Sequence, residues 1–141
     1  MKVGFIYALA AAVIWGLVYA LDQKILIKTT PLNLLFAGTV ITAVFLLPVV
    51  FMGNPFTAIL KSGTTNVALI MLTCFLNFAA AWFIYLSIQS VGASASTMIE
   101  MTYPFFVVLF SYFLFGQGIT PAIAWGGLFL FIGAFIITRA G

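Results

Sequence analysis

Charged side chains are scarce in this sequence of 141 residues: five are lysine or arginine and two are aspartate or glutamate. A soluble domain carries about 25% charged residues. Here the charged share is 5%, while 65% of the residues are hydrophobic. A small water-soluble domain has too little interior to bury that much apolar surface. The composition therefore excludes a soluble enzyme, a nucleic-acid-binding protein and a disordered tail, and it predicts an integral membrane protein.

Histidine is absent and cysteine occurs once, at Cys74. A single cysteine cannot form an intrachain disulfide. The lack of histidine removes the commonest metal ligand and proton shuttle, and two carboxylates with one thiol are too few to build a transition-metal site. The sequence also contains no phosphate-binding loop, dinucleotide fingerprint or catalytic triad motif. We therefore expect no cofactor, no metal site and no enzymatic activity.

Long apolar runs make up most of the chain. A helix needs about 20 apolar residues to cross the hydrocarbon core of a bilayer. The runs are continuous, whereas the strands of a membrane barrel alternate apolar and polar residues. Five runs predict five transmembrane helices, at residues 3–21, 32–52, 66–88, 94–115 and 122–138. The predicted fold is an all-α membrane protein with a single domain over residues 1–141.

The connections between these runs are short. Residues 89–93 and 116–121 contain glycine or proline, which predicts two tight hairpins. The longest connection, residues 53–65, carries its own helix signal, because Asn54 can cap a helix and Pro55 suits the first helical position. We expect a short helix there that lies at the membrane interface.

The most informative polar residue is Glu100, which lies six residues inside the fourth predicted helix. Acids inside a membrane helix are costly and usually face a cavity or a partner, and burial favours their neutral form. Pro104 has no N–H to offer the carbonyl group of Glu100. Ser96, Thr97 and Tyr103 share the face of Glu100 by helical spacing, so this face is expected to bind a proton or a polar ligand. In the alternative interpretation, Glu100 pairs with a lysine near the interface or is only a structural hydrogen-bonding group.

Weaker candidates for the same site lie on the first and third predicted helices. They are Trp15 and Tyr19 on the first helix and Asn77, Trp82 and Tyr85 on the third. Core packing or an interfacial belt is the alternative role for the aromatic residues. Asp22 stands at a helix end beside Lys24, so we expect it to be an ordinary solvated charge.

Small residues recur at every fourth position of the first predicted helix. They are Gly4, Ala8, Ala12, Gly16 and Ala20, which we call the small-residue stripe. Small side chains allow membrane helices to approach closely, where van der Waals packing holds them together. The stripe therefore predicts a close helix contact, either within one chain or between two chains.

The few positive charges give almost no preferred orientation in the membrane. Five crossings place Lys2 and Lys61 on one side, and Lys24, Lys28 and Arg139 on the other. Because cytoplasmic loops normally hold a clear excess of lysine and arginine, two against three predicts insertion in both orientations. Two oppositely inserted copies would form an antiparallel homodimer. A parallel dimer, or a complex with a different chain, is the alternative.

Four stretches of the sequence resemble one protein family. They are Trp15-Gly16 in the first helix, Pro31 at the start of the second, the run EMTYPFFVVLFSYFLFGQ from Glu100 to Gln117, and the closing GGLFLFIGAFIITR from Gly126. Together they resemble an EamA-type domain, the repeat unit of the drug/metabolite transporter superfamily. The chain departs from the family at Gln117, where glutamate is frequent.

This resemblance implies a function and an architecture. Members export small metabolites, amino acids or drugs, often in exchange for protons, and typical members look like ten helices built from two inverted repeats. The chain would then be half of such a transporter, acting as a homodimer on a small-molecule substrate in the lipid bilayer of a prokaryotic cytoplasmic (inner) membrane. A non-transporting membrane subunit or scaffold of a larger complex is the alternative function.

Overall fold

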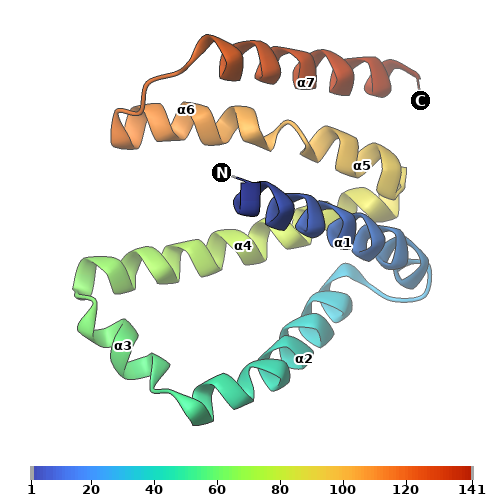
Figure 1. The fold of residues 1–141 in the computed structure, drawn as a ribbon. Coiled ribbons are helices and arrows are strands. Elements are labelled where there is room, and N and C mark those ends of the chain that lie inside the picture. Colours follow the sequence, from blue (N-terminus) through green and yellow to red (C-terminus); the bar gives the residue numbers. More distant parts are fainter. Residues whose placement is uncertain (1, 141) are drawn as a thin grey trace. The chain divides into compact units, whose positions relative to one another are not determined.

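The computed structural model describes residues 2–140, and every regular element in this range is a helix. The helices, labelled in Figure 1, are α1 (Lys2–Leu26), α2 (Pro31–Met52), α3 (Pro55–Lys61), α4 (Thr64–Val91), α5 (Ala93–Glu100), α6 (Tyr103–Phe115) and α7 (Pro121–Ala140). The prediction of an all-α protein is confirmed.

Four stretches of the described chain are long and apolar enough to cross a membrane. They are Val3–Leu26, Pro31–Met52, Thr64–Val91 and Ala93–Phe115, the last of which joins α5 and α6. The fifth predicted crossing corresponds to a shorter apolar helix, Pro121–Ile137. Four of the five predicted crossings thus have the length that a bilayer requires, and the fifth is at the short end of that range.

The chain divides into two compact units. The first comprises Met1–Gln23 and Ser87–Gly141, and the second comprises Lys24–Leu86. In the first unit α7 packs along α5 and α6, as Figure 1 shows. In the second unit the short helix α3 joins α2 to α4. The single domain expected over residues 1–141 remains a prediction.

Local capping explains where the helices of the second unit begin. The side chain of Thr30 accepts a hydrogen bond from the Asn33 N–H at 3.2 Å, directly before Pro31 at the start of α2. Asn54 accepts one from the Thr57 N–H at 3.3 Å, directly before Pro55 at the start of α3. These bonds satisfy N–H groups that the first turn of a helix leaves unpaired. The short helix predicted between residues 53 and 65 is therefore confirmed.

A hairpin was predicted at residues 89–93, but in the structure only Gly92 lies outside the helices there. Helix α4 continues to Val91 and α5 begins at Ala93. Gly92 has φ 85° and ψ 161°, a backbone conformation that is essentially restricted to glycine. Glycine thus allows α4 and α5 to meet with no further linker. Helix α1 also exceeds its predicted end and continues through polar residues to Leu26.

The fourth predicted crossing, residues 94–115, agrees in extent with the apolar stretch Ala93–Phe115, but this stretch is divided into two helices rather than one. The chain forms a turn at Met101 and Thr102, between α5 and α6. In this turn the Thr102 N–H bonds the Ile99 carbonyl at 3.1 Å, and Pro104 in the first turn of α6 has no N–H to donate. The break places Glu100 at the last position of α5 rather than in the interior of a helix.

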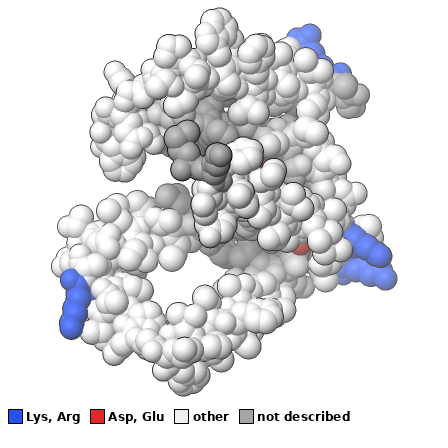
Figure 2. Space-filling view, viewed as in Figure 1, with Lys and Arg blue, Asp and Glu red and all other residues white. Residues whose placement is uncertain are grey.

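The surface is apolar, as a surrounding bilayer requires. Figure 2 shows a face that is white almost throughout, with lysine and arginine confined to a few sites. Several polar side chains within α2 and α4 hydrogen-bond to their own helix: Thr39 to the Leu35 carbonyl, Thr73 to the Leu69 carbonyl and Asn77 to the Thr73 carbonyl, each at 2.8 Å. Such local bonds keep polar groups satisfied where no water is present.

Candidate functional site

Glu100 accepts a hydrogen bond from a residue far away in the sequence, Tyr19. The Tyr19 hydroxyl donates to Glu100 Oε1 at 3.1 Å, across a separation of 81 residues. Both side chains are half-buried. Trp15 stacks on the ring of Tyr19, with ring centroids 5.5 Å apart and the planes inclined by 30°. Three predicted site residues are therefore joined in one chain of contacts, and Glu100 forms no ion pair within the described part of the chain.

A second contact fixes how α1 lies against α5. Gln23 Oε1 accepts a hydrogen bond from the Ala93 N–H at 2.7 Å. This bond supplies the cap that Gly92, which has no side chain, cannot provide to α5. Since Gln23 meets the start of α5 and Tyr19 meets its end, the two helices run antiparallel, as Figure 1 shows. We call the contact formed by Tyr19, Gln23, Ala93 and Glu100 the polar seam.

Ser96 lies between the two ends of α5. Its side chain is only 1% exposed, and its hydroxyl lies 2.8 Å from the hydroxyl of Ser87 at the end of α4. Thr97 instead donates to the Ala93 carbonyl of its own helix at 2.8 Å. Ser96 therefore ties α5 to α4, and the hydroxyl of Thr97 is already engaged locally. Both were predicted as ligand-facing residues, a role that remains a prediction.

Asp22 departs most from its expected environment. The prediction of a solvated charge is wrong, because Asp22 is only 6% exposed. Its Oδ2 atom is buried and has no hydrogen-bond partner in the described chain. Lys24, the expected neighbour in solution, is exposed and forms no ion pair with it. Sequence reasoning missed this because tertiary packing, rather than local charge, determines the burial of a residue at a helix end. The available signal was the spacing of Tyr19, Asp22 and Leu26 on one helical face.

Four predicted site residues remain: Tyr103, Asn77, Trp82 and Tyr85. Tyr103 follows the break and is 60% exposed, since the turn at Met101 interrupts the helical spacing that was expected to align it with Glu100. Asn77, Trp82 and Tyr85 belong to the other compact unit. There the Asn77 amide bonds its own helix, and the ring of Trp82 lies 6.2 Å from that of Phe78. Their part in a transport site stays a prediction.

The small-residue stripe on α1 is exposed along its whole length, from Gly4 through Ala8, Ala12 and Gly16 to Ala20. A methyl group added at Gly4 or Gly16 would meet no atom within 4 Å. The stripe is thus available for a close contact such as a second chain would make.

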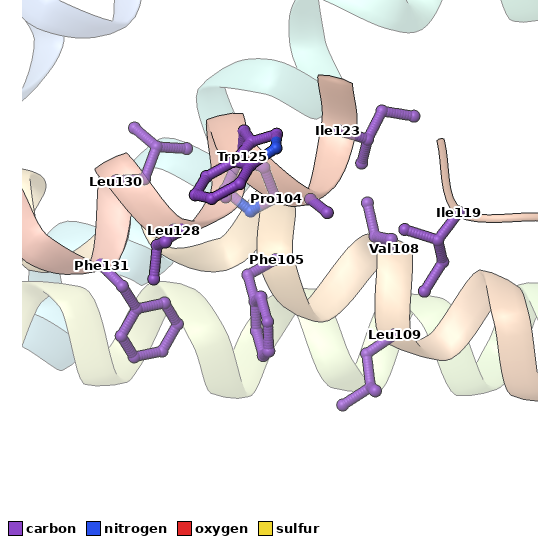
Figure 3. Close-up of a pocket in the computed structure, with 12 residues that line it drawn as sticks. Pro104, Phe105, Val108, Leu109, Ile119, Ile123, Trp125, Leu128, Leu130 and Phe131 are labelled. Carbon is purple, nitrogen blue, oxygen red and sulfur yellow. The ribbon is translucent and has the colours of Figure 1, made fainter. Parts of the chain in front are cut away.

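An apolar cavity lies between α6 and α7. Its volume is about 630 Å³, and Figure 3 shows its lining. The lining residues are Pro104, Phe105, Val108, Leu109, Ile119, Ile123, Ala124, Trp125, Gly127, Leu128, Leu130 and Phe131. The rings of Phe105 and Phe131 meet edge to face, with centroids 5.0 Å apart. Pro104, the first lining residue in chain order, follows Glu100 by four residues. The apolar lining suits a hydrocarbon or aromatic group.

The described residues contain no cluster of three or more histidine, cysteine, aspartate or glutamate side chains that could hold a metal ion.

Comparison with known proteins gives one match. The model of the EamA-like transporter family matches residues 2–139. No curated protein and no solved structure matches the chain.

Proposed function

This chain belongs to the EamA-like transporter family of the drug/metabolite transporter superfamily, and on that premise we propose that it is a secondary active transporter that exports small molecules in exchange for protons. It is a multi-pass integral membrane protein, and the family consists of transporters rather than enzymes. The observation that supports proton exchange most strongly is the position of Glu100. This acid stands at the break between α5 and α6, half-buried and held by the hydroxyl of Tyr19.

The proposed exchange follows from the chemistry of one carboxyl group. A neutral Glu100 is compatible with an apolar surrounding, whereas an ionised Glu100 needs water or a cation beside it. Because a proton and a cationic substrate compete for the same carboxylate, the release of one permits the binding of the other. Tyr19 can donate its hydrogen bond to Glu100 in either state and holds the carboxyl in place.

Two neighbouring features favour an organic cation with an apolar body as the substrate. Tyr19, whose hydroxyl contacts the carboxyl group, stacks its ring on that of Trp15, and aromatic faces attract cations. The apolar cavity beginning at Pro104 offers space for a hydrocarbon or aromatic group. Metabolites, amino acids and drugs that carry an amine all combine these two properties.

We further propose that the working unit is an antiparallel homodimer in a prokaryotic cytoplasmic membrane. Inverted repeats around a site near the bilayer midplane are common in transporters, and two oppositely inserted copies would supply them. The exposed small-residue stripe and the nearly even charge count support this assembly. Lysines at the exposed positions Ser90 and Val91 should lock one orientation and reduce activity, and a second variant with the opposite bias should restore it. Full activity from one fixed orientation alone would contradict the antiparallel arrangement.

Reconstitution tests the transport function directly. Purified protein in liposomes with an imposed pH gradient and an internal pH indicator would be offered amino acids, metabolites and apolar organic cations. We expect at least one solute to move protons through the wild type, and none to do so through Glu100→Gln, which keeps the shape of the side chain but removes its charge. Glu100→Asp, which keeps the carboxyl group, should retain part of the activity.

Two results would contradict the proposal. Normal gradient-driven transport in Glu100→Gln would leave Glu100 as a structural hydrogen-bonding group. Wild-type liposomes that move none of these solutes would favour a non-transporting membrane subunit. Size-exclusion chromatography of each variant establishes that a loss of transport does not come from a loss of fold.

A further inference from the structure

Asp22 is a buried carboxyl group that the proposed exchange at Glu100 does not use. It is 94% removed from solvent, since only 6% of its surface is exposed, and Oδ2 has no hydrogen-bond partner in the described chain. An ionised carboxylate in such a place is costly unless it is paired, whereas the neutral acid is tolerated far better. The surroundings of Asp22 therefore favour a carboxyl group that carries a proton.

The position of Asp22 relates it to the polar seam. Tyr19, Asp22 and Gln23 lie within about one turn of α1, on the face that meets α5 through the bonds of Tyr19 and Gln23. At about 1.5 Å per residue, Asp22 is about 4.5 Å along the axis from Tyr19. Gln23 and Lys24, which follow it, are exposed. Asp22 thus lies between the exposed end of α1 and the tyrosine that contacts Glu100.

Few other ionisable groups act on this part of the protein. The nearest on α1 are Tyr19 and the exposed Lys24, and on α5 the one ionisable side chain is Glu100. On α7, which packs against α5, it is the exposed Arg139. The part of α4 in this unit, residues 87–91, contains none. Asp22 and Glu100 are also the only two acidic side chains of the whole sequence. Glu100 accepts the hydrogen bond of Tyr19, and Asp22 lies about one helical turn from Tyr19 along α1.

We propose that Asp22 is a second proton-binding group, through which protons pass between water at the C-terminal end of α1 and Glu100. In the transfer, the O–H bond of the neutral Asp22 carboxyl breaks and a bridging water molecule accepts this proton. The water gives one of its own protons to the Tyr19 oxygen as the Tyr19 proton moves to Glu100 Oε1. Tyr19 ends unchanged, Glu100 ends neutral, and the Asp22 carboxylate then takes a proton from water. The reverse sequence releases the proton. The relay role of Asp22 rests on the proposed exchange at Glu100, whereas the protonation state of Asp22 can be measured independently of that exchange.

The composition of the chain allows a direct measurement on the wild type. Because Asp22 is the sole aspartate, protein grown with aspartate labelled with ¹³C at the side-chain carboxyl reports this one group. Infrared or NMR spectra of the labelled protein in lipid should show a protonated carboxyl near neutral pH. An ionised carboxylate there would overturn the proposal, and so would a signal that shifts on addition of Na⁺ at constant pH, because the site would then hold a metal cation.

Transport measurements on Asp22→Asn test the role of that proton. We expect the variant to lose gradient-driven transport but to retain counterflow, in which labelled solute exchanges for unlabelled solute with no net proton movement. Glu100→Gln should lose both, because it removes the binding group itself. Undiminished gradient-driven transport in Asp22→Asn would overturn the relay. If Glu100→Gln transports normally while the labelled Asp22 is protonated, the exchange proposal fails and the proton-binding assignment stands.

Discussion

The hydrogen bond between Tyr19 and Glu100 gives the sharpest quantitative prediction. Tyr19→Phe removes the hydroxyl that donates to Glu100 at 3.1 Å but keeps the ring that stacks on Trp15 with centroids 5.5 Å apart. Hydrogen bonds between membrane helices contribute about 0.6 kcal/mol on average and up to about 1.7 kcal/mol. Bonds to a charged partner reach about 1.5–3 kcal/mol in soluble proteins. For two half-buried groups we expect a coupling of about 1 kcal/mol, or about a fivefold change in the unfolding equilibrium constant.

A double-mutant cycle measures this coupling. Tyr19→Phe, Glu100→Gln and the double variant would be compared with the wild type by reversible unfolding in lipid–detergent mixtures. Tyr112→Phe is the matched control, because the Tyr112 hydroxyl makes no hydrogen bond in the described chain, and it should change stability by less than about 0.3 kcal/mol. If the effects of Tyr19→Phe and Glu100→Gln add to within about 0.3 kcal/mol, the bond does not hold α1 to α5 and our reasoning on the site is refuted.

Three further predictions concern the framework of the site. Gly92→Ala should destabilise the protein by about 1–3 kcal/mol, because a backbone with φ 85° and ψ 161° excludes side chains. Gly118→Ala is its control and should be nearly neutral in the same unfolding assay, since no atom lies within 4 Å of the new methyl group. Gln23→Ala should cost about 1 kcal/mol through loss of the cap on α5, and Gln117→Ala serves as its control, so equal stability of both variants would argue against that cap. Gly16→Leu should lower the dimer fraction in cross-linking experiments, and an unchanged fraction would show that the stripe faces lipid.

Much of the fold could be predicted from the sequence because membrane crossings depend on a simple property, the length of an apolar run. The short helix α3 was also predictable, since Asn54 and Pro55 mark its start locally. The break between α5 and α6 was not predicted. Pro104 removes one N–H, but whether a helix bends or opens there depends on the helices packed against it.

The candidate site was predictable in its members but not in its contacts. Tyr19 and Glu100 each stood out as polar residues in apolar helices, yet their pairing depends on how α1 packs against α5. The burial of Asp22 has the same origin. The local sequence around Asp22 indicated a solvated helix end. It could not indicate burial, because the residues that cover this acid come from elsewhere in the chain. Contacts between helices that are far apart in the chain cannot be predicted from a single sequence.

The separation of the partners in the polar seam has a consequence for biosynthesis. Tyr19 and Glu100 are 81 residues apart, and Gln23 and Ala93 are 70 apart. At about 5–20 residues per second, a ribosome needs about 4–16 seconds to add the residues that separate Tyr19 from Glu100. The first segment therefore leaves the ribosome with its polar groups unmatched, while α2 and α4 carry threonine and asparagine bonds that close within each segment. Helices α2 and α4 can therefore insert with these bonds already formed. The Tyr19 and Gln23 side chains of α1, by contrast, meet their partners only after α5 has been synthesised.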